Sequence, residues 1–494
     1  MPNPRSARFV IACIAIYVVV FSIFTIGRHD RYNSTAWDLA FNDQVLWNTA
    51  HGRFMQLSLF AGPTGNNWMS HVEPILILLA PIKLILPDVR WLLIIQTAAL
   101  ALGAWPTYRI AARRTGRPSV AALFALLYLL YPVLHWANKF DFHPLAFVPV
   151  LLLLAFDLFE TQHDGLMSVC LLLALGCKEE MGLIVMMFGL YVAIRGQRWR
   201  IGLAWAALGL AWFLLSAFVI LPSAQAASPV PIQGWSLKRY DWLFKGDLAA
   251  KIAFVTGPDT AVKLRFLVQL LAPLAFLPLL YPEIAILGAP SLALALLSSS
   301  LNQSGIFHQY MLPVVPFLMI AAIYALDRAQ RRLTMLFRRL HLRFRNTFAE
   351  RLVLIMATAL TLVSFVLYNP FLYVPREPYT PIYGWEPGAS VAALEKARTL
   401  IPPEGCLVAA NNIAAHYSDR VEIYLPDQYD PPGCRYVLLD LADQRFMLNG
   451  EDYVCSRLQS GEYLTRFYEN GVILLERRST APDSIPKPDI CGKR

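Results

Sequence analysis

The sequence predicts an α-helical polytopic membrane protein with a small C-terminal α/β domain. Three observations support this fold class. The chain of 494 residues is 56% hydrophobic and only 16% charged, whereas a soluble domain is typically about 25% charged. Its apolar residues fall in long blocks, and about 20 apolar residues suffice for a helix to cross a bilayer. Arginine clusters lie beside these blocks, as in cytoplasmic loops. The blocks predict about eleven transmembrane helices.

The first span is expected at residues 8–27, directly after Arg5 and Arg8. It is too long for the apolar part of a signal peptide and no small-residue cleavage site follows, so we interpret it as an uncleaved span. Because positively charged flanks stay in the cytoplasm, the N-terminus is expected to be cytoplasmic. The further spans are expected near residues 91–112, 118–136, 144–160, 165–178, 180–196, 200–221, 264–281, 283–300, 310–327 and 351–369.

The distribution of positive charge supports this arrangement. Alternating the spans from a cytoplasmic N-terminus places the Arg-rich turns 109–117 and 195–200 and the basic loop 328–350 in the cytoplasm. This agrees with the positive-inside rule. The basic loop 222–263 is an exception, because the same alternation places it outside. The net charge of +9 does not indicate nucleic-acid binding, since the chain has neither a zinc-binding spacing nor a basic-aromatic module.

Two apolar segments are not expected to form simple transmembrane spans. Residues 165–196 carry Lys178, Glu179 and Glu180 at their middle. Charges near the bilayer centre are costly, so we expect two short helices that meet at a polar elbow. Residues 74–87 are apolar but too short to span, and we expect a re-entrant or surface helix on the external side.

The first external loop, residues 28–73, is the most informative segment. Residues 36–50 are expected to form an amphipathic helix that lies in the membrane interface. Asp38 and Asp43 lie on this helix. Their spacing of five residues puts them roughly 140° apart, so the two carboxylates need not share a site.

Four short polar elements are expected on the external side, each at the end of an apolar span. Ionisable groups at such positions are candidates for function. Taken alone, each is equally well explained as a helix cap or an interfacial salt bridge. Besides Asp38, the candidate site residues are Asp43, His71, Glu73, Lys139, Asp141, His143, Lys178, Glu179, His308 and Gln309.

The composition changes after the last span. Residues 370–390 are rich in Pro, Tyr and Gly and are expected to form a linker. Residues 391–494 alternate helical and strand patterns and are expected to form a small external α/β domain that ends in a hairpin. All four cysteines of this region, Cys406, Cys434, Cys455 and Cys491, are available for disulfides in an oxidising compartment. Three pairings are possible.

Several motifs resemble a known family. The runs AWDLAFNDQVLWNTAHGR (36–53), FDFHPLAFVPVLLLLAF (140–156), KEEMGL (178–183) and VAANNIAAHYSDRVEIYLP (408–426) resemble the DUF2079 family of uncharacterised polytopic membrane proteins. The layout in turn resembles the GT-C superfamily of membrane glycosyltransferases. That resemblance implies a catalytic acid shortly after the first span and a polyprenyl-phosphate sugar donor. Asp38 is the best positional match for the acid, although Leu39 follows it where the superfamily often has Glu.

These expectations combine into a hypothesis with two alternatives. Asp38 would act as general base for a hydroxyl acceptor, and nearby cations would stabilise the leaving lipid phosphate. No cofactor is specified; a divalent metal is possible, but no spacing defines its ligands. The first alternative is a transporter or flippase of a lipid-linked or small polar substrate, and the second is a non-catalytic membrane scaffold. The sequence shows no internal repeat of the kind common in transporters.

Overall fold

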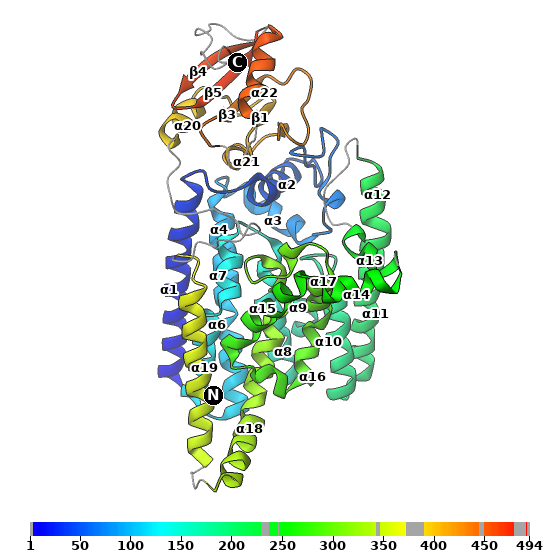
Figure 1. Cartoon of the computed structure of the whole chain (residues 1–494), viewed down its shortest axis with the longest axis vertical. Coiled ribbons are helices and arrows are strands. Elements are labelled where there is room, and N and C mark those ends of the chain that lie inside the picture. Colours follow the sequence, from blue (N-terminus) through cyan, green and yellow to red (C-terminus); the bar gives the residue numbers. More distant parts are fainter. Residues whose placement is uncertain are drawn as a thin grey trace.

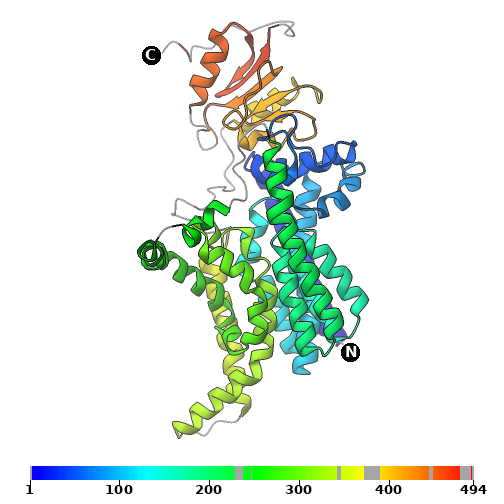
Figure 2. The same ribbon diagram turned by 90° about the vertical axis from the view of Figure 1, so that its right-hand side faces the viewer.

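The computed structural model describes residues 3–228, 237–245, 247–341, 346–371, 390–443, 449–478 and 491. A helical bundle carries a small domain at one end (Figure 1). The view turned by 90° shows the same arrangement, with residues 390–478 beyond the bundle (Figure 2). The chain's N-terminus lies toward the opposite end of the bundle (Figure 1). The expected linker, residues 370–390, lies almost entirely outside the described residues.

Four helices of the described chain are long and apolar enough to cross a membrane: Pro4–His29, Pro118–Lys139, Trp199–Ala226 and Thr347–Leu367. The predicted number of about eleven spans is not confirmed. Several predicted spans are instead divided into shorter helices. Residues 91–112, for example, form α4 (Arg90–Leu102) and α5 (Ala104–Thr115). Gly103 joins them, and a Cβ there would lie 2.1 Å from the Tyr128 hydroxyl oxygen, so this close approach requires glycine.

The remaining helices of the bundle follow the expected apolar blocks with interruptions. The N-terminal ones are α1 (Pro4–His29), α6 (Pro118–Leu129), α7 (Pro132–Lys139), α8 (Val148–Glu160), α9 (Asp164–Leu175), α10 (Met181–Arg195), α11 (Trp199–Leu215) and α12 (Leu221–Ala226). The later ones are α13 (Asp241–Phe244), α14 (Leu248–Thr256), α15 (Asp259–Leu271), α16 (Pro282–Ala285), α17 (Ala289–Leu297), α18 (Val315–Arg339) and α19 (Asn346–Leu367). Helices α9 and α10 are separated at residues 176–180, where the polar elbow was expected.

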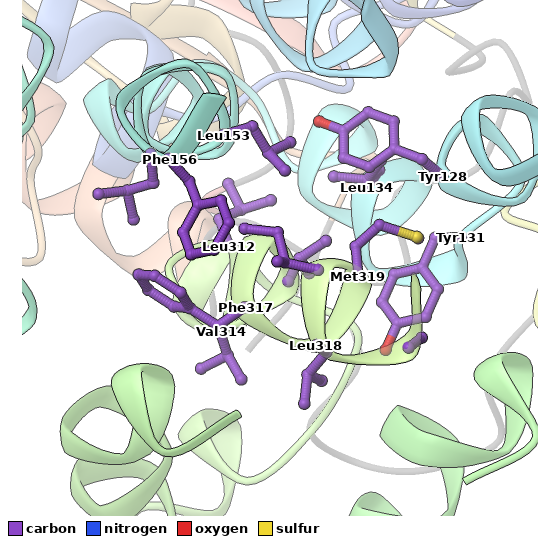
Figure 3. Close-up of a cluster of buried hydrophobic side chains, with 14 of the residues drawn as sticks. Tyr128, Tyr131, Leu134, Leu153, Phe156, Leu312, Val314, Phe317, Leu318 and Met319 are labelled. Atoms are coloured by element: carbon purple, nitrogen blue, oxygen red, sulfur yellow. The ribbon is translucent and has the colours of Figure 1, made fainter. Parts of the chain in front are cut away.

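Small residues let neighbouring helices approach closely. A Cβ on Gly189 would lie 2.4 Å from the backbone of Ala206, and one on Gly209 would lie 2.5 Å from the backbone of Gly182. Such contacts between backbones are the usual way in which helices associate in lipid. Further along the bundle, the first half of α18 is buried against α5, α6 and α8. Met319 and Phe317 of this half pack near Tyr131 and Phe156 (Figure 3).

The basic end of α18, including Arg338 and Arg339, protrudes from the bundle at the end opposite the C-terminal domain (Figure 1). The basic half of this helix and the C-terminal domain therefore lie at opposite ends of the molecule. This is the separation that the positive-inside argument requires. The membrane sidedness itself stays a prediction.

The first loop differs from the expected interfacial helix. Residues 36–50 form a π-helical turn (Ala36–Ala40) followed by α2 (Phe41–Ala50). Both faces of α2 are covered, because α3 (Ile75–Lys83) packs on one side and the C-terminal domain on another (Figure 1). Asn42, Asp43 and Gln44 are all buried. The polar side chains of this helix therefore bind other parts of the chain, while its placement in the membrane interface stays a prediction.

The segment expected as a re-entrant or surface helix contains α3. Its nine residues extend only about 14 Å, which is too short to cross the hydrocarbon core.

The C-terminal domain contains a five-stranded sheet in the order β2-β1-β3-β5-β4. Strands β1 (Leu407–Ala409), β2 (Ile423–Tyr424) and β3 (Tyr436–Asp440) are parallel, and β4 (Tyr463–Glu469) and β5 (Val472–Arg477) form an antiparallel hairpin. The helices are α20 (Val391–Arg398), α21 (Asn411–Ala414) and α22 (Gly450–Gln459). The predicted hairpin turn is confirmed, with positive φ at Asn470 and Gly471.

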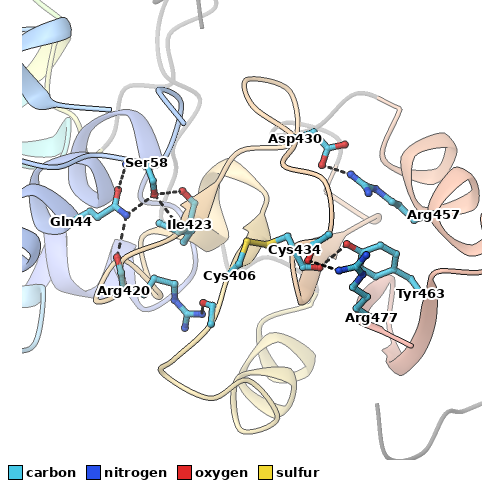
Figure 4. Close-up of a disulfide and its surroundings, with 12 residues drawn as sticks. Gln44, Ser58, Cys406, Arg420, Ile423, Asp430, Cys434, Arg457, Tyr463 and Arg477 are labelled. Carbon is cyan, nitrogen blue, oxygen red and sulfur yellow. Dashed lines mark hydrogen bonds and ion pairs between the residues drawn. A yellow bond between two sulfur atoms is a disulfide. The ribbon is translucent and has the colours of Figure 1, made fainter. Parts of the chain in front are cut away.

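Two disulfides link the four cysteines of this domain, Cys406 to Cys434 and Cys455 to Cys491. The first joins β1 to the loop before β3. The same region contacts the first loop, where Gln44 and Ser58 hydrogen-bond with Arg420 and Ile423 (Figure 4). The domain is thus attached to the membrane part by polar contacts as well as by the chain.

Candidate functional site

A cavity of about 160 Å³ lies at the end of the bundle that faces the C-terminal domain. We call it the Asp38 cavity. The first loop, the elbow between α9 and α10, and residues 303–310 all contribute to it. Its charged and histidine side chains are Asp38, His71, Glu73, His143, Lys178 and Arg239.

The central contact of the cavity joins Asp38 and His143. Oδ1 of Asp38 lies 2.7 Å from Nε2 of His143. The two side chains are 17% and 12% exposed, so both remain accessible from the cavity. Oδ2 of Asp38 accepts a hydrogen bond from the Thr35 hydroxyl at 3.2 Å. The carboxylate is therefore held by two donors at the edge of an open space.

Asp141 holds the segment that carries Asp38. Its Oδ2 accepts a hydrogen bond from the Thr35 backbone N–H at 2.8 Å and lies 3.0 Å from the Thr35 hydroxyl oxygen, whose one hydrogen it shares with Asp38. Its Oδ1 forms an ion pair with Arg28 at 2.5 Å, and both side chains are almost fully buried. Asp141 does not line the cavity. It fixes Thr35, which in turn contacts Asp38.

His143 is held from the opposite side. Its backbone N–H donates to Oε1 of Gln96 at 2.8 Å, and Gln96 in turn donates to the backbone oxygen of Asp141. Burial lowers the pKa of His143, but the Asp38 carboxylate, followed by Glu73 and Asp141, has the larger combined effect and raises it above its usual value. The imidazole is thus favoured as a cation beside Asp38.

A second pair of a histidine and an acid, His71 and Glu179, lies at another wall of the Asp38 cavity. Nδ1 of His71 lies 3.1 Å from Oε1 of Glu179, whose Oε2 accepts from the Val72 backbone N–H at 3.1 Å. Burial opposes ionisation of Glu179, but His71 and Lys178 hold its pKa below the ordinary value. Burial and the Glu179 charge raise the pKa of Glu73. Oε2 of Glu73 is buried without a hydrogen-bond partner among the described residues.

Two cations reach the same space. Lys178 is only 5% exposed; its Nζ lies 3.5 Å from Oε2 of Glu180 and 5.4 Å from the centre of the Tyr310 ring. Arg239 comes from the 3₁₀-helical turn Leu237–Tyr240, directly before α13. Arg239 is not among the site residues predicted from the sequence. The signal was nevertheless present, because 222–263 was the one basic loop expected outside.

Aromatic side chains close the cavity on the side of the first loop. The rings of Trp37 and Phe60 stack with their centres 4.6 Å apart, and Phe41 lies against Phe60 at 5.5 Å. Trp37 is only partly buried. One wall is therefore apolar and flat while the other carries charge, a combination that suits a ligand with both kinds of surface.

The other candidate residues divide into three groups. Gln309 lines the cavity, whereas His308 lies beside it, buried, with its ring packed on Phe140; burial lowers the pKa of His308 to about 4, which favours the neutral imidazole. Glu179 contacts His71, which lines the cavity. Lys139 and Asp141 lie behind the cavity, where the Lys139 backbone oxygen accepts a hydrogen bond from Arg28.

Asp43 is the candidate that the structure separates from the cavity. Its Oδ1 lies 2.7 Å from Nζ of Lys83, and its Oδ2 accepts from the Ser418 hydroxyl at 2.7 Å. Lys83 also pairs with Asp419 at 2.7 Å. The expectation of substrate binding by Asp43 is thus not supported by its position, because the turn of the helix points it toward the C-terminal domain.

The sequence pattern does not indicate which residues would bind a metal ion. Within the described part of the chain, no three His, Cys, Asp or Glu side chains are grouped in a way that could hold a metal ion.

The fold defines the protein as a polytopic helical membrane protein with a small C-terminal α/β domain. The structure is similar to a crystal structure of ArnT from Cupriavidus metallidurans bound to undecaprenyl phosphate, with a TM-score of 0.56 and 13% sequence identity. The match covers 97% of this chain and 99% of that one. For the apo state of ArnT, the TM-score is 0.50 with 13% identity, over 95% and 98% of the two chains. At such low identity, the likeness shows the fold alone.

The chain belongs to the DUF2079 family of predicted membrane proteins, whose pattern matches residues 28–474. The match begins just after the predicted first span and ends in β5, so it includes both the cavity and most of the C-terminal domain. No curated protein sequence matches the chain.

Proposed function

We propose that the protein is a membrane glycosyltransferase that moves a sugar from a polyprenyl-phosphate donor to a hydroxyl acceptor in the Asp38 cavity. The observation that carries the proposal is the pairing of Asp38 with His143 in a cavity that also contains Lys178 and Arg239. The undecaprenyl phosphate bound to the similarly folded ArnT supports the choice of donor.

In the proposed reaction, the acceptor oxygen attacks the anomeric carbon while the bond from that carbon to the phosphate oxygen breaks. Asp38 takes the proton of the acceptor hydroxyl. His143 and Thr35 hold the two carboxylate oxygens, so the base is oriented before the acceptor arrives.

Negative charge grows on the departing lipid phosphate. Lys178 and Arg239 are the cations of the cavity that would stabilise it. Arginine and lysine are the usual partners of phosphate oxygens. The partly exposed ring of Trp37, backed by Phe60, provides an apolar wall against which a sugar ring can lie.

The test is sugar transfer by membranes that contain the protein. Polyprenyl-phosphate glucose, mannose and arabinose, each with a radiolabelled sugar, would be offered in turn, and label would be followed into acceptors. Asp38→Asn removes the base at nearly constant shape and should abolish transfer without lowering the amount of protein. The matched control is Asp427→Asn, the same change at an exposed acid.

Three results would distinguish the transferase with Asp38 as its base from the alternatives. Label transferred by the wild type and by Asp427→Asn, but not by Asp38→Asn, supports the transferase. A fully active Asp38→Asn variant removes Asp38 from the mechanism. Accumulation of intact donor on the other side of sealed vesicles, with no transfer, favours a transporter or flippase.

A further inference from the structure

The C-terminal domain contacts the segment that carries Asp38 directly. Residues 411–420 lie along residues 29–44. Nε2 of His416 lies 3.1 Å from the His29 backbone oxygen. At the far end, Nε2 of Gln44 donates to the Arg420 backbone oxygen at 3.1 Å.

Between these two contacts lies one at the start of the π-helical turn. Oδ1 of Asn411 accepts a hydrogen bond from the Ala36 backbone N–H at 2.7 Å. Ala36 is the first residue of the turn and Asp38 the third. The first N–H groups of a helical turn have no partner within it, and a side chain from outside the turn is one of the groups that can satisfy them. Thr35, the residue directly before the turn, makes no capping hydrogen bond with its side chain.

Asn411 belongs to the C-terminal domain, so this contact holds the turn from the side of that domain. Asn411 begins α21, directly after β1 and Ala410. The sheet and the Cys406–Cys434 disulfide lie immediately behind it. The other side of the turn is fixed by Asp141 through Thr35. Asp38 therefore belongs to a turn that is held from the membrane part on one side and from the C-terminal domain on the other.

We propose that Asn411 is a positioning residue, through which the C-terminal domain holds the Asp38 turn in the geometry required for proton transfer. This inference rests on the proposed function. It assigns the domain a part in the reaction beyond attachment to the bundle. Asn411 itself has no contact with the cavity and touches no reacting group; it acts through the backbone of Ala36.

Two variants at this position separate a lost hydrogen bond from a changed volume. Asn411→Leu keeps the approximate size and removes the acceptor. Asn411→Asp keeps an acceptor oxygen at the start of α21, where a negative charge is favourable. The matched control is Ser390→Ala, which removes a buried hydrogen bond to Asp440 inside the same domain, away from the first loop.

The measurement is hydrogen–deuterium exchange of the full-length protein in detergent, read on a peptide that covers residues 35–41. Asn411→Leu should make the Ala36 amide exchange about three- to tenfold faster, as expected for the loss of one hydrogen bond. Asn411→Asp and Ser390→Ala should exchange as the wild type does. Unchanged exchange in Asn411→Leu, or equally fast exchange in Ser390→Ala, overturns the proposal.

Transfer kinetics with whichever radiolabelled polyprenyl-phosphate sugar proves active provide the second readout. Asn411→Leu should lower kcat with little change in KM, and Asn411→Asp should restore kcat. Faster exchange without a change in kcat overturns the positioning role. An active Asp38→Asn variant would instead refute the proposed general base, whatever the exchange shows, so the two failures are distinguishable.

Discussion

Nε2 of His143 and Oδ1 of Asp38 lie 2.7 Å apart, although the two residues are separated by 105 positions in the chain. The contact joins the loop after the predicted first span to the loop after α7. Each partner is supported by its own hydrogen bonds, Asp38 by Thr35 and His143 by Gln96. The pair is thus preorganised by two separate parts of the bundle, and its charge state should affect stability as well as activity.

The first prediction concerns pH. Because the pKa of His143 is raised in the folded protein, the ion pair with Asp38 contributes fully below the unfolded pKa of about 6.5 and is lost as pH rises through the folded pKa. His143→Gln should therefore lower the thermal unfolding midpoint in detergent more at pH 6 than at pH 9. At pH 6 the cost should be about 1–3 kcal/mol, as for a hydrogen bond to a charged group.

His163→Gln is the control for this experiment, since His163 is exposed. Its unfolding midpoint should follow the wild type at both pH values. An equal loss of stability at pH 6 and pH 9 for His143→Gln would show that the imidazole contributes only as a neutral hydrogen-bond partner.

The second prediction contrasts two acids that lie close together. Asp141→Asn leaves the guanidinium of Arg28, which is 2% exposed, without its carboxylate. Breaking a buried pair in this way typically costs about 3–5 kcal/mol, so Asp141→Asn should reduce the yield of folded protein on size-exclusion chromatography. Asp38→Asn should lower the yield much less, because Asp38 faces the cavity and its pairing with His143 contributes only about 1–3 kcal/mol. Normal yield and stability of Asp141→Asn would contradict the structural role given to this residue.

The third prediction concerns the charges between α2, α3 and the C-terminal domain, where Lys83 and Asp43 are buried and Asp419 is partly exposed. Lys83→Met leaves the Asp43 and Asp419 carboxylates without their shared cation, at a cost of about 3–5 kcal/mol. Adding Asp43→Asn should recover part of this loss, because one of the two unpaired charges disappears. Lys245→Met, which breaks an exposed pair with Asp241, should cost less than about 1 kcal/mol. Thermal unfolding of the wild type, these three variants and Asp43→Asn alone tests this order; additive losses of the two single variants in the double variant would exclude the coupling.

Much of the cavity could be predicted from the sequence, because membrane topology orders positions that are distant along the chain. His71, His143, Lys178 and Gln309 all follow or precede apolar blocks at ends that the alternation places on one face. A helix that crosses the membrane ends on the opposite face from where it began. The ends of different helices therefore share a face even when they are far apart in the sequence. That constraint predicts which residues share a side, and the structure brings these four to one cavity.

The partners of individual side chains could not be predicted in the same way. Asp43 and Ser418 are 375 positions apart, and only the docked C-terminal domain makes them neighbours. Asp141 and Thr35 meet because Asp141 adopts a positive φ of 67° that no local pattern indicates. Hydropathy also overestimated the continuity of the spans, since a window average does not register a break such as that at Gly103.

The fourth prediction concerns sidedness. If the C-terminal domain is external, a membrane-impermeant maleimide should label intact spheroplasts only after reduction, because Cys406, Cys434, Cys455 and Cys491 are all in disulfides. A cysteine introduced by Arg339→Cys, at the basic end of α18, should react only after the membrane is permeabilised. Labelling of that cysteine from outside would reverse the predicted orientation.

The central claim is that a polyprenyl phosphate binds with its phosphate in the Asp38 cavity. A cryo-electron-microscopy structure of the protein with undecaprenyl phosphate tests it most directly. The account predicts phosphate density within hydrogen-bonding distance of Lys178 and Arg239, beside the Asp38–His143 pair, and loss of that density in a Lys178→Gln, Arg239→Gln variant. Phosphate density at any other position, with the Asp38 cavity holding only water, would contradict it.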